Sequence, residues 1–226
     1  MAGIHIPSSP SSPLAQARHI VVEGPIGAGK STLARRLAEH LNARPVLEDP
    51  EANPFLGRFY QDRHRYALPT QLHFLLKRHD QLAALQEHLL PAEATPVVCD
   101  FLADKDALFA RINLSDEELA LYQRLSERSP LPQVTPDLVI FLQAAPENLI
   151  ARVRRRASAS ERTVDDTYLV RLADAYSHFA YHYDACPVMI VNSDNLNFAD
   201  RDDDFHLLLE RLGQQRSHRE FFNLGG

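Results

Sequence analysis

The sequence predicts an α/β fold of three layers, in which a five-stranded parallel sheet lies between two layers of helices. Short apolar segments rich in β-branched residues alternate along the chain with segments of helical period. The apolar segments are apolar throughout and not only at alternate positions, which is typical of strands buried on both faces of a parallel sheet. The first of them runs into a glycine-rich loop and then a helical segment. These observations together indicate a sheet of parallel strands joined by helices.

Five segments have the length and composition of such strands. Three of them end in an acidic residue, which is Glu23, Glu48 or Asp100. Because ligands bind parallel sheets at the carboxyl ends of the strands, we expect these acids to meet at one edge. The predicted strands are 19–23, 45–48, 95–100, 138–142 and 188–191.

Helical periodicity and helix-end signals predict the helices between these strands. Leu33, Leu37 and Leu41 recur at intervals of four residues directly after the glycine loop. Pro91 ends a long helix, and Ser115 is a good N-cap followed by three acidic residues. The helix at 146–156 starts with a proline at a tolerated position. The predicted helices are 33–41, 55–60, 68–90, 104–111, 116–127, 146–156, 166–183 and 202–213.

Length and charge limit the classes of protein to consider. The 226 residues suffice for one domain with a substantial core, and we expect it to span 17–214. Residues 1–16 have the composition of a disordered Ser/Pro arm and lack the features of a signal peptide, and 215–226 are expected to form a tail. A net charge of −6 argues against a general binder of nucleic acid or anionic membranes.

Cysteine content and hydropathy indicate a cytoplasmic protein without a membrane span. Cys99 and Cys186 lie in apolar segments without metal-ligand spacing, so we expect packed thiols in a reducing cytosol. No segment approaches the roughly 18 apolar residues of a membrane span.

The glycine-rich loop matches the pattern G-x-x-x-x-G-K-[ST] of a phosphate-binding P-loop. It follows a predicted strand and opens a predicted helix, which is the setting in which backbone N–H groups point at phosphate oxygens. Lys30 would reach the β- and γ-phosphates of ATP, and the Ser31 hydroxyl would bind Mg²⁺. The alternative is a glycine turn that matches by chance. The expected nucleotide contacts are Gly24, Gly27, Ala28, Gly29, Lys30, Ser31 and Thr32.

Two of the strand-end acids have the chemistry of a phosphoryl-transfer site. Asp100 follows an apolar strand and would hold Mg²⁺ directly or through water, or it would merely cap the next turn. Glu48 would accept a proton from an attacking hydroxyl, or it would be a solvated acid of an acidic loop.

Two helices carry further candidate side chains. Arg152 and Arg156 lie one turn apart before a polar segment, so they would face the same way in an arginine lid over the phosphates, or would be ordinary partners of a helix C-terminus. On the long helix, Gln71, Phe74 and Arg78 share one face, on which they would read a flat heterocycle or form a solvated edge beside a core phenylalanine.

With these residues in place, the chain resembles the deoxynucleoside kinase family, specifically its bacterial deoxyadenosine/deoxyguanosine kinase-like branch. The resemblance covers about residues 18–212, and all P-loop proteins share its first segment. Segments 48–56, 59–62 and 66–78, in this order and spacing, are far more specific. The matching segments are 24–32, 48–56, 59–62, 66–78, 100–109 and 152–161.

The resemblance implies a role for each matched position. Glu48 would take the proton of the deoxyribose 5′-hydroxyl, and a homodimer that packs long helices together is implied as well. The other implied contacts are those of Tyr60 and Glu161 with the 3′-hydroxyl, of Gln71, Arg78 and Asp106 with the nucleobase, and of Arg152 and Arg156 within the lid.

The sequence departs from the family pattern after the third strand. The family has an acid, then arginine, then serine, whereas this chain has Asp100, Phe101 and Leu102. A phenyl ring neither pairs with Glu48 nor donates to a phosphate. Lys105 or Arg162 would have to supply the missing cation.

The sequence therefore predicts Mg²⁺-dependent transfer of the ATP γ-phosphoryl group to the 5′-hydroxyl of a deoxyribonucleoside, with a purine base favoured. Glu48 would deprotonate the hydroxyl, Lys30 and the lid arginines would neutralise charge, and Asp100 with Ser31 would bind the metal. One alternative is a nucleoside monophosphate kinase of the thymidylate kinase type, for which Arg63, Arg65 and Arg78 would hold the acceptor phosphate. The other is a non-catalytic nucleotide-binding regulator, which Phe101 favours.

Overall fold

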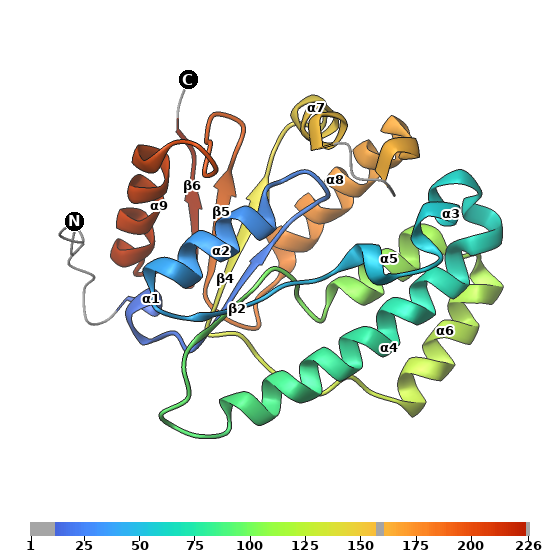
Figure 1. Ribbon diagram of the computed structural model, residues 1–226, viewed down its shortest axis with the longest axis horizontal. Coiled ribbons are helices and arrows are strands. Elements are labelled where there is room, and N and C mark those ends of the chain that lie inside the picture. The colour runs from blue at the N-terminus through green and yellow to red at the C-terminus, as the bar shows by residue number, and fades with distance from the viewer. Residues whose placement is uncertain (1–11, 157–160, 225–226) are drawn as a thin grey trace.

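A sheet of six parallel strands forms the centre of the computed structural model, which describes residues 12–156 and 161–224 (Figure 1). The order β2-β3-β1-β4-β5-β6 places the first strand in the interior, and every neighbouring pair is parallel. The strands are β1 His19–Glu23, β2 Arg44–Val46, β3 Val97–Cys99, β4 Leu138–Gln143, β5 Val188–Asn192 and β6 Arg219–Phe222.

Helices cover both faces of the sheet, as the sequence predicts. Alternate strand residues point to opposite faces, so Ile20 and Val22 pack with α2 and α9, whereas Val21 packs with α4 and α8. The helices are α1 Pro13–Gln16, α2 Lys30–His40, α3 Leu56–Gln61, α4 Arg63–Leu89, α5 Lys105–Asn113, α6 Asp116–Arg128, α7 Pro146–Arg156, α8 Asp166–His182 and α9 Asp202–Gln214, with 3₁₀ turns η1 Pro50–Ala52 and η2 Glu161–Thr163.

The prediction of five strands is wrong by one, because β6 lies in the segment expected to be a tail. β6 pairs with β5 at the edge of the sheet, and its Phe222 is buried while its Phe221 is exposed. Gln215 supports the approach to the strand by donating to the carbonyl of Val188. Edge strands are short and polar, and this one has no continuous apolar run by which a sequence analysis recognises a buried strand.

Residues 1–11 of the expected arm lie outside the described residues. The last residues of that segment form a short helix and not a disordered arm. Ser12 caps α1, and Leu14 of this short helix is buried against the core. The long helix α4 begins at residue 63 and not at 68, because the Asp62 side chain caps it by accepting from the N–H of Arg65. Pro69 lies inside the helix.

The two phenylalanines of β6 provide a test of this edge strand. We expect Phe222→Ala to lower the free energy of unfolding by about 3 kcal/mol, because it removes a buried ring from the core. Phe221→Ala is the matched control, and its exposed ring should contribute no more than about 0.5 kcal/mol. Urea denaturation measures both, and equal losses would show that β6 does not pack as described.

Candidate active site

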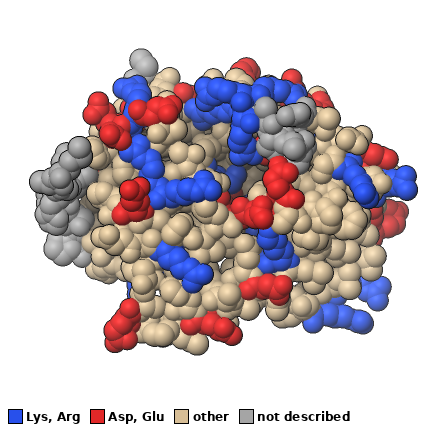
Figure 2. Space-filling view, in the orientation of Figure 1, with Lys and Arg blue, Asp and Glu red and all other residues tan. Residues whose placement is uncertain are grey.

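A cavity of about 360 Å³ lies at the carboxyl edge of the sheet, a size that suits a small-molecule ligand. Figure 2 shows basic and acidic side chains together around a hollow near the centre of this face. Three of the predicted residues, Gly24, Ala28 and Arg152, do not line the cavity. The predicted residues that line it are Gly27, Gly29, Lys30, Ser31, Thr32, Glu48, Tyr60, Gln71, Arg78, Asp100, Asp106, Arg156 and Glu161.

The glycine loop has the strand–loop–helix setting that a phosphate cradle requires. Gly24 has a φ of +151°, and a Cβ there would lie 2.4 Å from the carbonyl oxygen of Leu142. Lys30 folds back over the loop, where its Nζ donates to the carbonyl of Gly24 at 2.8 Å and to that of Pro25 at 3.1 Å. Burial lowers the pKa of Lys30 from its ordinary value. The loop therefore holds a desolvated cation against its own backbone carbonyl groups.

The two residues predicted to bind Mg²⁺ meet in the structure. The hydroxyl of Ser31 donates to Oδ2 of the buried Asp100, and Oδ1 of the same carboxylate accepts from the backbone N–H of Glu48 at 2.6 Å. Among the described residues no three His, Cys, Asp or Glu side chains form a metal cluster. Mg²⁺ in phosphoryl-transfer sites is usually held by one or two protein ligands together with phosphates and water, so this pair fits such a site.

Glu48 lies between two cations in the interior. Its Oε1 accepts from Nη2 of Arg78 at 2.8 Å, and its Oε2 accepts from Nζ of Lys105 at 2.7 Å. Burial by itself raises the pKa of this carboxyl group, but the charges and hydrogen bonds of Lys105 and Arg78 outweigh burial and hold the pKa well below its ordinary range. Glu48 is thus a largely buried, ionised carboxylate, with a side chain that is 14% exposed, and not a solvated loop acid.

The face of α4 that was predicted to read a heterocycle contacts α5. Nε of Arg78 donates to Oδ1 of Asp106 at 3.0 Å, and Nε2 of Gln71 donates to the backbone carbonyl of Asp106 at 3.1 Å. The hydroxyl of Tyr122 donates to Oδ2 of the same carboxylate at 3.2 Å. Both carboxylate oxygens of Asp106 are thereby oriented, which fixes the polar wall of the cavity.

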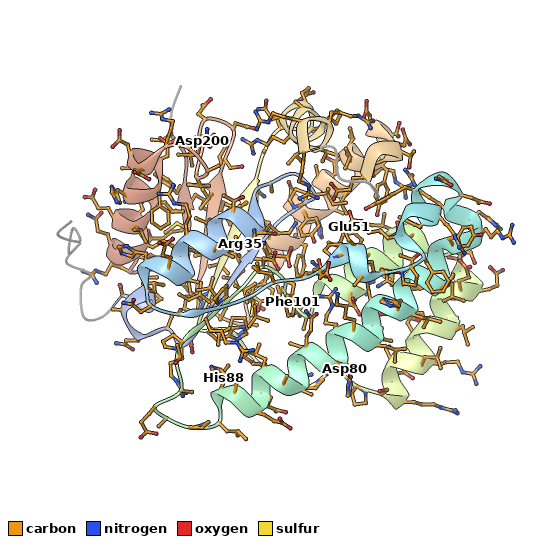
Figure 3. All side chains as sticks on the ribbon, viewed as in Figure 1. Arg35, Glu51, Asp80, His88, Phe101 and Asp200 are labelled. Atoms are coloured by element: carbon orange, nitrogen blue, oxygen red, sulfur yellow. The ribbon has the colours of Figure 1, made fainter. Side chains whose placement is uncertain are left out.

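Phe101 is buried beneath this wall, between the sheet and α4 (Figure 3). The guanidinium of Arg78 lies 5.5 Å from the centre of its ring, a cation–π distance. Of the two residues proposed to replace the family arginine, Lys105 contacts Glu48 directly, and the side chain of Arg162 is outside the part of the chain that the structure describes.

The far end of the cavity holds the residues predicted to contact the sugar. Glu161 is buried and accepts from Nε of Arg156 at 3.0 Å, with a second, short hydrogen bond from Nη2. Tyr60 is buried nearby, and its ring lies 6.4 Å from that of Tyr168. Arg156 therefore reaches the cavity from α7, whereas residues 157–160 of the predicted lid lie outside the described residues.

Arg152 has a different environment from Arg156. Its Nη1 donates to the hydroxyl of Ser193 at 3.1 Å and its Nη2 to the Ser193 carbonyl at 2.5 Å. The two arginines are one turn apart on α7, as predicted, but they do not share a partner. Arg152 ties α7 to the loop that follows β5.

Glu23, a strand-end acid to which the sequence analysis gave no role, organises the site. Glu23 is fully buried, accepts from the N–H of Gly24 at 2.8 Å and from the Tyr176 hydroxyl at 3.1 Å, and through Oε2 accepts from the N–H of Leu102 at 2.7 Å. It thereby joins the glycine loop, the segment after β3 and α8. The sequence did contain a signal for this role, because Glu23 ends a wholly apolar strand. A carboxylate buried at such a position needs hydrogen-bond partners.

Comparison with known proteins finds similarity to deoxynucleoside kinases in sequence and in structure. The sequence model of the deoxynucleoside kinase family matches residues 20–215. A deoxyguanosine kinase of Bacillus subtilis is 31% identical over 71% of this chain and 77% of its own length, and a deoxyadenosine kinase of Lactobacillus acidophilus is 32% identical over 79% and 87%. A solved deoxyadenosine kinase from M. mycoides is 22% identical, covers 87% of this chain and 100% of its own, and has a TM-score of 0.74, which supports the fold.

The hydrogen bonds of Glu23 predict the effect of removing its charge. In Glu23→Gln, whichever way the amide points, the N–H of either Gly24 or Leu102 faces an NH₂ group. We expect a loss of about 2–3 kcal/mol in the free energy of unfolding. Urea denaturation measures it against Glu39→Gln, an exposed control on α2, and equal stabilities of the two variants would contradict the role of Glu23.

Proposed function

The chain belongs to the deoxynucleoside kinase family, and from that premise we propose that it transfers the γ-phosphoryl group of ATP to the 5′-hydroxyl of a deoxyribonucleoside. The observation that carries the proposal is the position of Glu48. Its carboxylate lies in the cavity between Arg78 and Lys105, and its backbone N–H binds Asp100, which in turn accepts from Ser31 of the glycine loop. One residue thus links the phosphate end of the cavity to the acceptor end.

The proposed chemistry assigns each end of the cavity a task. Glu48 accepts the proton of the 5′-hydroxyl as the oxygen attacks, and Lys30 with Arg156 neutralises the charge that spreads over the transferred phosphoryl group. Ser31 and Asp100 would hold Mg²⁺, which supplies charge neutralisation across the phosphates when it is bound. Arg152 would support the lid from outside the cavity, through Ser193.

We propose a purine deoxyribonucleoside as the acceptor. The fixed group of Gln71, Arg78 and Asp106 presents donors and acceptors side by side, and a site built on such pairs discriminates strongly between bases. The two relatives compared above are a deoxyguanosine kinase and a deoxyadenosine kinase, which favours a purine. Tyr60 and Glu161 would contact the 3′-hydroxyl at the far end.

The two alternative functions have weaker support. A nucleoside monophosphate kinase would need cations for the acceptor phosphate, but neither Arg63 nor Arg65 is among the described residues that line the cavity. Arg63 lies 4.2 Å from the ring centre of Tyr168 and Arg65 lies 5.4 Å from that of Tyr66. A non-catalytic regulator was suggested by Phe101, yet Lys105 places a cation at Glu48.

We further propose a cytoplasmic homodimer. Both cysteines are free and buried, which suits a reducing compartment. The helices α4 and α6 pack together and expose three large apolar side chains, Leu76, Leu121 and Leu125, which supports an interface on this surface. None of the described helices has the length and apolar character that crossing a membrane requires.

The reaction is tested by incubating the protein with ATP, Mg²⁺ and a panel of deoxynucleosides, ribonucleosides and nucleoside monophosphates. We expect purine deoxynucleosides to gain phosphate. Glu48→Gln should lose about 10²-fold or more in kcat because it removes the base, while ATP affinity is retained. Asp49→Asn, an exposed neighbouring acid, is the control. A folded wild-type protein that binds ATP and phosphorylates no nucleoside would refute the proposal.

The proposed dimer is tested by sedimentation. The wild-type chain should sediment as a dimer, and Leu76→Glu should shift it toward the monomer because a charge would be buried at the interface. Leu90→Glu alters another exposed leucine, beyond the end of α4, and should leave the dimer intact. A monomeric wild-type protein would rule out the interface.

A further inference from the structure

Lys105 occupies an unfavourable position for a lysine. It is the first residue of α5, where the helix dipole is positive, and only 4% of it is exposed. Burying an ammonium group costs several kcal/mol unless opposite charges and hydrogen bonds compensate. The compensation comes from Glu48, whose Oε2 accepts from Nζ at 2.7 Å, and from Glu23, whose Oε2 lies 4.0 Å away.

The surroundings of Lys105 explain why the cation comes from α5. The side chain of Phe101 fills the space below Arg78 and has no donor, so the segment directly after β3 contributes no cation to the Glu48 carboxylate. Arg78 contacts Glu48 as well, but its Nε is bound to Asp106. Arg78 thus contacts both Asp106, in the polar wall of the cavity, and Glu48. Lys105 contacts the carboxylates of Glu48 and Glu23, on the side of the cavity nearer the glycine loop.

We propose that Lys105 is a positioning residue for the phosphoryl transfer, which holds the Glu48 carboxylate in place and supplies the second positive charge beside it, on the oxygen that Arg78 does not contact. The proposal rests on the proposed function. It assigns the two cations different tasks: Lys105 serves the reacting end of the cavity, and Arg78 also serves recognition of the base through Asp106. The role requires a positive charge beside Oε2 of Glu48, which a side chain other than lysine could also supply.

The division of tasks predicts how variants divide between kcat and KM. Lys105→Met keeps the length of the side chain and removes its charge, so kcat should fall about 10²-fold, with the KM for ATP and for the deoxynucleoside changed less than about threefold. Lys105→Arg should recover at least tenfold of the loss, because it restores the cation. Arg78→Met should raise the KM for the deoxynucleoside as well, since it also releases Asp106.

Lys77 provides the matched control. It is the other lysine of the acceptor half of the molecule, and its Nζ lies 3.8 Å from Oδ2 of Asp49, next to Glu48 in the chain but outside the cavity. Lys77→Met should leave kcat unchanged. Lys105→Met removes one partner of a buried ion pair, so it should also lower the melting temperature. Thermal unfolding therefore fixes an assay temperature at which every variant is folded, and the loss of kcat is measured at that temperature.

Two readouts separate this proposal from the proposed function. An active wild type whose kcat survives Lys105→Met, or a Lys105→Met defect that Lys105→Arg does not rescue, overturns the role of Lys105 alone. An inactive wild type overturns the proposed function, and a crystal structure of Lys105→Met then decides the positioning role by itself. A Glu48 carboxylate displaced from its wild-type position supports the role, and an unmoved one overturns it.

Discussion

The structure around the cavity depends on one chain of buried charges of alternating sign. It runs from Glu23 through Lys105, Glu48 and Arg78 to Asp106, with side chains that are 0%, 5%, 14%, 3% and 5% exposed. Each interior member contacts one opposite charge on either side, so no member is buried alone. Because an unpaired buried charge costs several kcal/mol, the elements that carry these residues are held at one mutual distance.

This constraint joins the two functional halves of the molecule. Glu23 belongs to β1 and binds the glycine loop, whereas Arg78 and Asp106 belong to α4 and α5 beside the acceptor part of the cavity. Glu48, between them, is also tied to Asp100 and thereby to Ser31. The phosphate side is built from strand ends and a loop, which many nucleotide-binding folds share, and the acceptor side is built from helices that lie beyond the sheet.

The same arrangement accounts for the loss of the family arginine after β3. A phenylalanine at residue 101 fills the space beneath Arg78, and a lysine from the following helix approaches Glu48. The cation therefore comes from a later position in the chain than the family arginine, and the Glu48 carboxylate has a cation on each of its oxygens.

The sequence by itself determined the features that depend on local patterns. Apolar runs marked five strands, a proline marked the start of α7, and the glycine loop gave the expected phosphate site. Only the tertiary structure decided which side chains meet across elements: the partners of Glu23, the contact of Lys105 with Glu48, and the binding of Arg152 to Ser193. It also decided that β6 joins the sheet, since an edge strand lacks the apolar signal of a buried one. Local conformation follows from neighbouring residues, whereas the pairing of buried charges depends on packing between segments far apart in the chain.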